Sequence, residues 1–528
     1  MKTKLLTVVL LLVALGGAAQ IRINTDQTTP MQKLLNAQMA ISNLYVDDVD
    51  EGKLVEAAIR GMLQQLDPHS TYVTKEEVAA LNIQLSGNFE GIGVEFNMIE
   101  DTLLVVQPVV GGPSERIGII AGDRIVSVDD VTIAGVHMSK DEIVRRLRGP
   151  KGTKVKLGVM RQGFDEVLTF NVVRDKIPVK SIDATYMIRP GIGYIRIGNF
   201  GATTHKEMKE ALAKLKKQGM TSLILDLQEN GGGYLNAAVD ISNEFLAPGD
   251  LIVYTEGRRA RRTEYKANNT GNFMSGQLVV LVDEYTASAA EIVTGAVQDQ
   301  DRGIVVGRRT FGKGLVQRQI ELRDSSMIRL TVAHYYTPAG RCIQKPYTSG
   351  HNDDYAQDVR RRLLGGELMS ADSIHFADSL KCYTLRKHRT VYGGGGIMPD
   401  YFVPLDTTIY TYYHRQLSAK SIILPANLRY VDANRIQLKA KYKTFDEFKK
   451  KFEIPQSVID GIIAEGERQG IKPRNKAEMK KTLPYLKLQL KALVARDLWD
   501  MSEYFAIMNE SSPTVQRAVT LLEEITIH

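Results

Sequence analysis

The sequence predicts a multidomain protein of the mixed α/β class, with helical regions at both ends. Its 528 residues suit three or four domains at roughly 150 residues each. Short apolar strands and amphipathic helices alternate through the middle of the chain, whereas helical periodicity dominates the two flanking regions. Charged residues at 24% and hydrophobic residues at 43% are typical of a folded protein with an ample core.

The first residues have the pattern of a secretory signal peptide. Lys2 and Lys4 precede an apolar stretch, residues 5–15, and small residues follow up to Ala19. The stretch is too short to span a bilayer, and cleavage after Ala19 is expected. Because no other apolar run approaches about 18 residues, we expect an exported protein that is soluble in the periplasm or another extracytoplasmic compartment.

Two amphipathic helices are expected next, at residues 31–45 and 53–66. The second carries apolar residues at helical spacing, and Asp67-Pro68 ends it, because the residue before a proline disfavours the helical conformation. A helical hairpin of this kind needs an apolar surface to cover.

The central region is expected to form a sheet of parallel strands. Its apolar runs are short and rich in β-branched residues, which favours buried strands, and a helix is expected at residues 205–218. The predicted strands lie at residues 192–197, 222–227, 278–283 and 303–306.

Ser288 lies where a strand turns into a helix. The strand at residues 278–283 is followed by a turn-prone segment, and a helix is expected to begin near Thr286 or Ala287. A hydroxyl at this point lies beside the free N–H groups and positive end of the helix, which can stabilise an oxyanion formed by attack on a carbonyl.

Lys313 ends a segment, residues 307–313, that matches the first seven positions of a phosphate loop. Nucleotide binding is nevertheless rejected. Gly314 replaces the hydroxyl that binds magnesium, and residues 315–322 alternate as a strand where a helix is required. The glycines 231–233 lack dinucleotide-site spacing, and the nine histidines form no metal motif. No cofactor or metal is therefore expected.

The segments around Ser288 and Lys313 together resemble the carboxy-terminal processing (tail-specific) serine proteases. That family has its nucleophile in S-A-S-A-E and its base in F-G-K-G-x-x-Q, which correspond here to TASAAEI and TFGKGLVQ. The resemblance implies that Ser288 is the nucleophile, Lys313 the base and Gln317 the residue that orients the lysine. It also implies a crotonase-like αββ core and an oxyanion hole formed by Ala289 and Gly233, with Gly232 as the next candidate.

Residues 89–174 resemble the PDZ domain that is inserted in these proteases. The segment FEGIGVEF opens it, a short helix is expected at residues 140–147, and residues 154–160 alternate as a strand. The resemblance implies capture of a peptide tail, because glycines let backbone N–H groups converge on a carboxylate. The expected tail-binding residues are Gly91, Ile92, Gly93 and Val94, with Ile143, Val144 and Leu147 along the groove. In the alternative interpretation, the glycine segment is only a tight turn, and Ile143, Val144 and Leu147 belong to the core of the domain.

These patterns divide the chain into five parts. A polar segment at residues 347–389 is expected to be a surface excursion from the protease core, and the C-terminal region is expected to be helical, with a capping box at Thr444 and Glu447. The parts are a signal peptide at residues 1–19, a helical N-terminal region at 28–82, a PDZ domain at 83–175, a protease core at 176–405 and a helical C-terminal domain at 406–528.

The formal net charge of +7 is partly concentrated at residues 472–496, which hold eight basic residues and one acid, Glu478. Two interpretations stay open: a solvated helix face, or contact with an adaptor or an anionic membrane surface. No motif for nucleic-acid binding is present. Homo-oligomers through the helical terminal regions are expected, and Cys342 and Cys382 can pair in an oxidising compartment, which the sequence does not decide.

The leading functional hypothesis is an endopeptidase that binds exported proteins by a free C-terminal tail and cleaves them with Ser288, Lys313 and Gln317. An inactive PDZ scaffold is the first alternative, although all three side chains are present. A crotonase-type acyl-thioester enzyme is the second, but it explains neither this combination of residues nor a PDZ domain. Substrate identity and any activating partner stay open.

Overall fold

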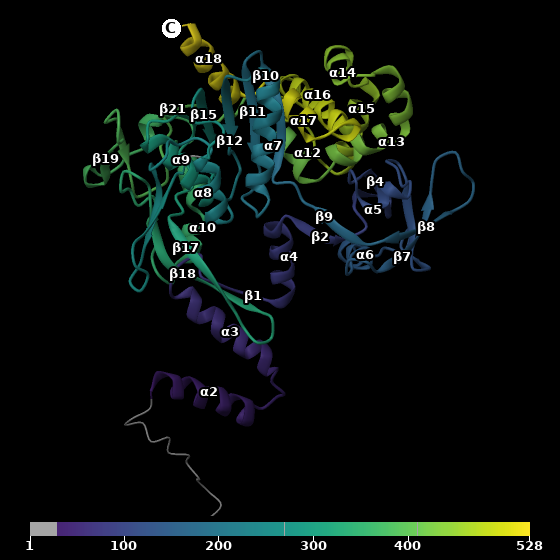
Figure 1. Ribbon diagram of the computed structural model, residues 1–528. Helices are drawn as coiled ribbons and strands as arrows, with labels where there is room; N and C mark the ends of the chain where they lie inside the picture. The colour runs from purple at the N-terminus through teal and green to yellow at the C-terminus, as the bar shows by residue number, and fades with distance from the viewer. Residues whose placement is uncertain (1–28, 269, 409, 528) are drawn as a thin grey trace, which may run out of the picture. The chain divides into compact units, whose positions relative to one another are not determined.

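The computed structural model describes residues 29–268, 270–408 and 410–527 (Figure 1). The expected signal peptide lies outside the described residues. The chain divides into two compact units, and the boundary along the sequence falls between Gln65 and Leu66. No helix in the described ranges is both long enough and apolar enough to cross a membrane.

The described part of the first unit, residues 29–65, forms the helices α2 (Pro30–Leu44) and α3 (Glu51–Gln64). Thr29 and Gln32 form a capping box at the start of α2, and the Asp50 carboxylate accepts a hydrogen bond from the Lys53 N–H at the start of α3. Both predicted helices are confirmed, and each begins one or two residues earlier than expected. Apolar residues of α2 are exposed, among them Met31, Leu34, Leu35, Met39 and Leu44.

The second unit begins with β1 (Thr71–Val73) and the helix α4 (Lys75–Ser86). A capping box of Thr74 and Glu77 starts α4, and Gly87 ends it in the left-handed conformation, with φ 71°. The strands β2 (Asn88–Gly91) and β9 (Asp175–Pro178) then pair in antiparallel fashion. These two strands bracket the region that the sequence predicts to be a PDZ domain.

The region between β2 and β9 forms an antiparallel sheet with its own apolar core. The strand order is β3-β4-β5-β7-β8, with β6 paired to β5. The predicted helix and strand at residues 140–147 and 154–160 are confirmed as α6 and β7. The elements are β3 (Val94–Ile99), β4 (Thr102–Pro108), α5 (Pro113–Arg116), β5 (Arg124–Val128), β6 (Val131–Thr132), α6 (Lys140–Leu147), β7 (Lys154–Met160) and β8 (Leu168–Val173).

The central sheet has the strand order β10-β11-β12-β15-β16-β21. The strands β10 and β11 are antiparallel, and the others run parallel to β11. All four predicted strands are present, with ends shifted by one residue at most. The elements are β10 (Ile182–Arg189), β11 (Ile192–Ile197), β12 (Ser222–Asp226), β15 (Gln277–Val282), β16 (Ile304–Gly307) and β21 (Tyr401–Phe402).

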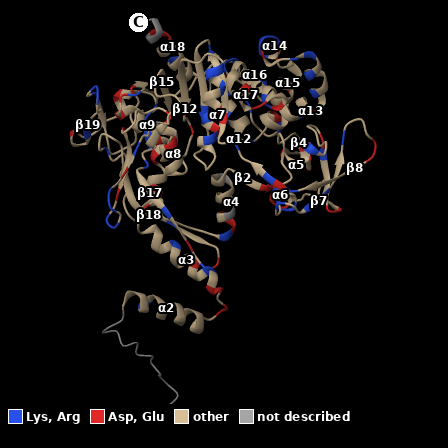
Figure 2. Ribbon diagram, in the orientation of Figure 1, with Lys and Arg blue, Asp and Glu red and all other residues tan. Residues whose placement is uncertain are grey.

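One face of the central sheet is covered by α7 (Thr204–Lys217), α8 (Leu235–Asn243) and α9 (Ala289–Asp299). Alternate residues of β12 and β15, such as Leu223 and Val280, face these helices, as the period of two in a strand requires. In Figure 2 the strand β15 carries no charged residue, whereas basic residues occur along α7.

The last helix, α18 (Pro513–Ile527), packs against the other face of the central sheet (Figure 1). Its buried residues include Val515, Val519, Leu521 and Leu522, which lie in one cluster with residues of β12 and β15. Each side chain of this size contributes about 1.5 to 3 kcal/mol when fully buried. The C-terminal region therefore completes the core of the central sheet.

A second sheet has the order β1-β18-β13-β14, with β17 paired to β18. The predicted strand after Lys313 is confirmed as β17, and residues 327–336 form β18. A bulge interrupts the pairing of β17 between Val316 and Gln317. The remaining elements are β13 (Leu251–Glu256), β14 (Thr263–Lys266), β17 (Leu315–Glu321) and β18 (Met327–Tyr336).

The segment at residues 347–389 is only partly a surface excursion. Tyr355 and Arg362 are buried, and the Arg362 guanidinium donates a hydrogen bond to the carbonyl of Thr310, just before the Lys313 turn, at 3.1 Å. The segment therefore also supports the site. Its elements are α10 (Asn352–Ala356), α11 (Asp358–Leu364), two 3-10 turns (Ala371–Ser373 and Asp378–Leu380) and β19 (Lys381–Tyr383), which pairs with β20 (Thr390–Tyr392).

Six further helices form the predicted helical C-terminal region around a core of their own. The Thr444 hydroxyl caps α14 by accepting the Glu447 N–H at 3.2 Å, and most basic residues of the segment 472–496 are exposed, which agrees with a solvated helix face. Figure 2 shows basic residues on α14 as well. The helices are α12 (Tyr412–Ala419), α13 (Ile423–Lys441), α14 (Phe445–Lys451), α15 (Gln456–Arg468), α16 (Lys476–Leu498) and α17 (Met501–Met508).

Candidate active site

Ser288 occupies a strained turn between β15 and α9. Its backbone has φ 55° and ψ −114°, a region that residues with a side chain rarely adopt and that costs about 1 to 3 kcal/mol. The turn is fixed by Thr286, whose hydroxyl accepts the Asp283 N–H at 2.9 Å and donates to the Leu227 carbonyl at 2.8 Å. The helix begins at Ala289, two or three residues later than expected. Ser288 thus precedes a helix N-terminus, as the sequence predicts.

The glycine loop at residues 231–233 packs directly against this turn. A Cβ atom on Gly232 would lie 2.8 Å from the Ser288 Cβ and 2.9 Å from the Ala289 nitrogen. On Gly233 it would lie 2.1 Å from the Phe200 carbonyl oxygen. Both glycines have positive φ angles, 97° and 150°. Only glycine permits this backbone and this close approach.

Two backbone N–H groups next to Ser288 have no acceptor within the described ranges, those of Ala289 and Gly233. The Gly232 N–H, by contrast, donates to Asn230 Oδ1 at 2.8 Å. Of the two glycines expected in the oxyanion hole, Gly233 is therefore the one with a free donor.

Lys313 lies in a tight turn that leads into β17. Its own N–H and that of Gly312 both donate to the Glu291 carboxylate, at 2.9 and 2.8 Å. Burial, and next the positive charge of Arg329, lower the pKa of Lys313 to about 8, because both disfavour the charged amine. A substantial fraction of this lysine is therefore neutral near pH 8.

Glu291 joins the Ser288 turn to the Lys313 turn. Besides the two N–H groups from the Lys313 turn, its carboxylate accepts hydrogen bonds from the Ser288 N–H and the Thr310 hydroxyl. Burial raises the pKa of Glu291 to about 7. Sequence reasoning gave this residue no role, although it stands in the quoted segment TASAAEI.

Tyr335 forms a second link between the same two turns. Its buried hydroxyl lies 2.6 Å from the Lys313 carbonyl oxygen and 3.1 Å from that of Ser288. Sequence reasoning missed this residue too, since a tyrosine in an alternating strand gives no sign of a distant partner.

Gln317 lies near the expected place but contacts a different residue. Its amide nitrogen donates to the Thr331 hydroxyl at 3.3 Å, and in the described chain no hydrogen bond joins it to Lys313. Lys313 and Gln317 both line one cavity. The register shift opposite Val316 and Gln317 leaves Val332 of β18 as the extra residue, so it does not interrupt the alternation of β17. The role of Gln317 in orienting Lys313 stays a prediction.

The loop of Asp67, His69 and Ser70 lies behind Gln317. Thr331 donates its hydroxyl to Asp67 Oδ1 at 3.0 Å, and the Ser70 hydroxyl donates to Asp67 Oδ2 at 2.5 Å. His69 Nε2 lies 2.8 Å from the Tyr355 hydroxyl. Burial, and next the charge of Lys313, lower the pKa of His69 to about 3. His69 is therefore neutral at physiological pH, and the sequence had indicated only a helix end here.

A cavity of about 610 Å³ brings the predicted residues together. Side chains of Leu235, Ile292 and Leu315 form an apolar part of its wall, and Arg329 adds a positive charge. Ser288 and Lys313 both line the cavity, but in the described residues no hydrogen bond joins their side chains. The predicted catalytic and oxyanion residues that line it are Ser288, Lys313, Gln317, Ala289, Gly232 and Gly233.

The expected tail-binding turn lies between β2 and β3. Gly93 has φ 73°, and the N–H groups of Ile92 and Gly93 have no acceptor in the residues that the structure describes. Gly91 ends β2, and Val94 opens β3. Ile143 and Leu147, expected along the groove, are instead buried in the core of this region, whereas Val144 is half-buried. The two core residues occupy the positions that the alternative interpretation gave them.

No group of three or more His, Cys, Asp or Glu residues that could hold a metal ion occurs in the described ranges. Cys342 and Cys382 are both free thiols in this structure.

The fold and the site define a serine-type peptidase with a PDZ domain. Residues 191–356 match the model of peptidase family S41, and residues 104–161 match a PDZ domain. Residues 17–77 match the N-terminal domain of the activating protease CtpB, and residues 413–500 match a family of unknown function, DUF8443.

Two relatives extend this match over most of the chain. The carboxy-terminal processing protease CtpA of Bacillus subtilis is 37% identical over 330 residues, which cover 62% of this chain and 70% of that protein. A carboxy-terminal-processing protease of Bartonella bacilliformis is 36% identical over 334 residues, which cover 62% of this chain and 76% of that protein. The chain belongs to the carboxy-terminal processing protease family, so the expected mixed α/β fold and peptidase class are confirmed.

Two solved structures are similar over shorter or looser alignments. The photosystem II D1 C-terminal processing protease is 31% identical and covers 60% of this chain and 90% of its own, with a TM-score of 0.32. The PDZ domain of a carboxy-terminal protease from Vibrio cholerae, solved with a peptide, is 35% identical. The match covers 17% of this chain and 99% of that one, with a TM-score of 0.16.

Proposed function

We propose that the chain is an endopeptidase that captures exported proteins by a free C-terminal tail and cleaves them through an acyl-enzyme on Ser288. One observation carries the proposal. Ser288 and Lys313 line one cavity, and the pKa of Lys313 is lowered to about 8. A lysine with an ordinary pKa of about 10.4 is almost fully protonated at neutral pH and is a poor base.

The first chemical step is attack of Ser288 on the scissile carbonyl. Neutral Lys313 accepts the hydroxyl proton as the bond forms, and the free N–H groups of Ala289 and Gly233 donate to the developing oxyanion. The protonated lysine then gives its proton to the leaving amine. Water hydrolyses the acyl-enzyme, with Lys313 again as the base. Hydrogen bonds between a base and its nucleophile often form only when the substrate is bound.

The cavity and the PDZ domain suggest what the substrate looks like. The apolar wall of Leu235, Ile292 and Leu315 suits an apolar side chain next to the scissile bond. The unpaired N–H groups of Ile92 and Gly93 suit a C-terminal carboxylate. The expected signal peptide supports exported proteins as the substrates, and the helical terminal regions are where assembly into homo-oligomers or contact with an adaptor would occur.

The test compares wild type with Ser288→Ala and Lys313→Ala in two measurements. Purified enzyme is given an unfolded protein substrate, and the exported proteins that accumulate in cells are compared between the variants. Both variants should lose cleavage at an unchanged melting temperature, because the two residues act as one unit. Ser418→Ala and Lys420→Ala, at exposed positions of α12 and beyond its end, are the matched controls. Cleavage at the wild-type rate in Ser288→Ala would reject the mechanism, and a wild type without Ser288-dependent cleavage would favour the PDZ scaffold.

A further inference from the structure

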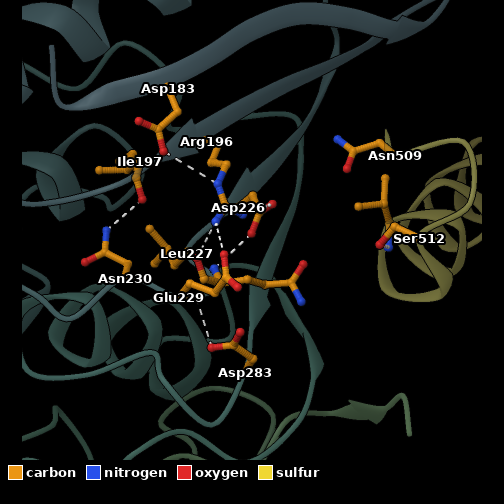
Figure 3. Close-up of polar contacts among 12 residues, drawn as sticks. Asp183, Arg196, Ile197, Asp226, Leu227, Glu229, Asn230, Asp283, Asn509 and Ser512 are labelled. Atoms are coloured by element: carbon orange, nitrogen blue, oxygen red, sulfur yellow. Dashed lines mark hydrogen bonds and ion pairs between the residues drawn. The ribbon is translucent and has the colours of Figure 1, made fainter. Parts of the chain in front are cut away.

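Arg196 of β11 is a buried arginine that the proposed mechanism does not use. It lies beside Asp226 at the end of β12, where its Nη1 donates to Asp226 Oδ2 at 2.9 Å (Figure 3). Its Nη2 donates to the Gln228 carbonyl at 2.9 Å and to Glu229 Oε2 at 3.0 Å. Its Nε lies 3.6 Å from Asp183 Oδ2 of β10. One planar guanidinium therefore joins two strands to the loop that follows β12.

That loop leads within a few residues to the proposed oxyanion donor. Glu229 has φ 61°, a left-handed conformation that a residue with a side chain adopts only when its surroundings hold it. Its N–H donates to Asp283 Oδ1 at 3.0 Å. Asn230 then donates from Nδ2 to the Ile197 carbonyl at 2.7 Å (Figure 3). Its Oδ1 accepts the Gly232 N–H at 2.8 Å. These contacts hold Glu229, Asn230 and Gly232, the residues that lead to Gly233.

The other side of Arg196 faces the C-terminal helices. The ring centroid of Phe505 in α17 lies 4.7 Å from the guanidinium carbon, a cation–π contact. The same helix is attached to β10, because the Ser502 hydroxyl accepts the Thr185 N–H at 3.1 Å and Asn509 donates to the Tyr186 hydroxyl at 2.8 Å. The position of α17 and its C-cap residue Asn509 is thus tied to β10, the strand that pairs with β11, which carries Arg196.

Glu229 also lies between two cavities. It lines the catalytic cavity, and it lines a second cavity of about 520 Å³ together with Arg196, Asp226, Asp283 and Phe505. Glu229 is exposed, and it is a residue that the catalytic cavity shares with the cavity beside the C-terminal helices.

We propose that Arg196 is a positioning residue through which helix α17 holds the Gln228–Gly233 loop in the arrangement that points the Gly233 N–H at the oxyanion. The inference rests on the proposed function, since it gives Gly233 the role of oxyanion donor. It assigns to the C-terminal helical region a role in turnover, separate from substrate capture. Lysine cannot replace this arginine, because a single ammonium group does not reproduce the planar fork that binds three acceptors here.

The first test uses two substitutions on opposite sides of the link, Arg196→Lys and Phe505→Leu. Each is compared with wild type for kcat and KM on one peptide, for inhibition by the matching peptide aldehyde, which forms a tetrahedral adduct with Ser288, and for melting temperature. Removal of one oxyanion donor costs roughly 10²- to 10³-fold in kcat, so displacement of the loop should lower kcat by about 10-fold or more. KM should stay within about twofold, and aldehyde affinity should fall in parallel with kcat/KM.

The control is Phe273→Leu. The ring of Phe273 lies 5.8 Å from the guanidinium carbon of Arg302, and Phe273 is buried, so the control loses at least as much packing at a place that does not contact the loop. It should change the melting temperature but neither kcat nor aldehyde affinity. If Phe505→Leu lowers the melting temperature without changing kcat or aldehyde affinity, Arg196 is only a structural ion pair and the inference is overturned.

A double variant provides the second test. If α17 acts through Arg196, then Arg196→Lys combined with Phe505→Leu should be no slower than Arg196→Lys alone, within about twofold, because both changes break one link. Effects that multiply would show independent routes and would overturn the inference. If the wild type cleaves in a Ser288-dependent way and kcat is unchanged in all these variants, only this inference is rejected. If the wild type shows no Ser288-dependent cleavage, the proposed function itself is rejected.

Discussion

The backbone N–H groups of Ser288 and Lys313 donate to the same oxygen, Glu291 Oε2, at 2.8 and 2.9 Å. The two residues come from different segments, the start of α9 and the turn before β17. One buried carboxylate therefore fixes the separation of the proposed nucleophile and the proposed base. Tyr335 reinforces the link from the other side, through the carbonyls of the same two residues.

The first prediction concerns Glu291→Gln. A glutamine amide offers one oxygen where four hydrogen-bond donors converge, so its NH₂ group faces at least one N–H. A buried donor left without an acceptor costs about 1 to 3 kcal/mol. We expect a loss of unfolding free energy of about that size and a fall in kcat of at least about 10-fold, since misplacement of reacting groups by about 1 Å can cost roughly 100-fold. Thermal unfolding and peptide hydrolysis measure the two effects.

Glu523→Gln on the exposed side of α18 is the matched control and should behave as wild type. Wild-type stability and kcat in Glu291→Gln would show that the shared carboxylate does not set the geometry of the site.

The second prediction is a pH profile. Lys313 must be neutral to accept a proton, and its pKa is lowered to about 8, so kcat/KM should rise with pH through about 8. The positive charge of Arg329 contributes to this lowering. Arg329→Gln removes that charge, which raises the pKa of Lys313 and moves the midpoint to higher pH. Activity at pH 7.5 should fall more than activity at pH 10.

Arg323→Gln, at an exposed position between β17 and β18, is the control and should leave the midpoint in place. Burial raises the pKa of Glu291 to about 7, so a second inflection near that pH is expected, and it should not follow the Arg329 substitution. An unchanged upper midpoint in Arg329→Gln would mean that Lys313 is not the group that titrates.

The third prediction concerns Gln317→Ala. Its amide contacts Thr331, whose hydroxyl contacts the buried Asp67, so Gln317 is braced in the cavity beside Lys313. We expect kcat to fall by about 10- to 100-fold while KM changes little, because Gln317 orients the base and does not hold the substrate. Steady-state kinetics separate the two parameters. Thr331→Val should reproduce part of the loss in kcat, and a Gln317→Ala enzyme with wild-type kcat would make Gln317 a purely structural residue.

Local patterns in the sequence predicted most of the fold. The strand at residues 278–283 was recognisable because the short apolar run LVVLV fits only a buried strand or a short buried helix. The helix at residues 140–147 has the same bounds in the structure. The position of α18 on the central sheet was not predicted, because an amphipathic helix shows that it has an apolar face but does not show which surface covers that face.

The site was predicted only where short motifs carry its residues. Ser288 and Lys313 stand in recognisable segments, and the structure brings them into one cavity. The supporting residues Glu291, Tyr335 and Asp67 act through partners that are distant in sequence, so periodicity gives no signal for them. The contact of Gln317 was missed because its partner Thr331 lies on β18, and the sequence does not show which residues of two paired strands lie opposite each other.

The last prediction is that a free C-terminal carboxylate governs substrate capture. The N–H groups of Ile92 and Gly93 have no acceptor in the residues that the structure describes, and a hydrogen bond to a charged group contributes about 1.5 to 3 kcal/mol, or roughly 10- to 150-fold in affinity. A peptide with an amidated end lacks that charge. The amidated peptide should bind more weakly than the acid peptide by this factor. Both affinities are measured by calorimetry or fluorescence anisotropy on the Ser288→Ala protein, which does not cleave the peptides.

Two glycine variants locate the effect within the PDZ domain. Gly93 and Gly163 both have left-handed backbones, with φ 73° and 88°, but a Cβ on Gly93 would lie 2.9 Å from Ile177 Cδ1, whereas one on Gly163 would meet nothing within 4 Å. Gly93→Ala should therefore disturb the turn and abolish the difference between acid and amide peptides, while Gly163→Ala should preserve it. Equal binding of both peptides to the Ser288→Ala protein would refute tail recognition and would leave the chemistry of Ser288 and Lys313 untouched. Discrimination that survives in Gly93→Ala would place the carboxylate site elsewhere in the chain.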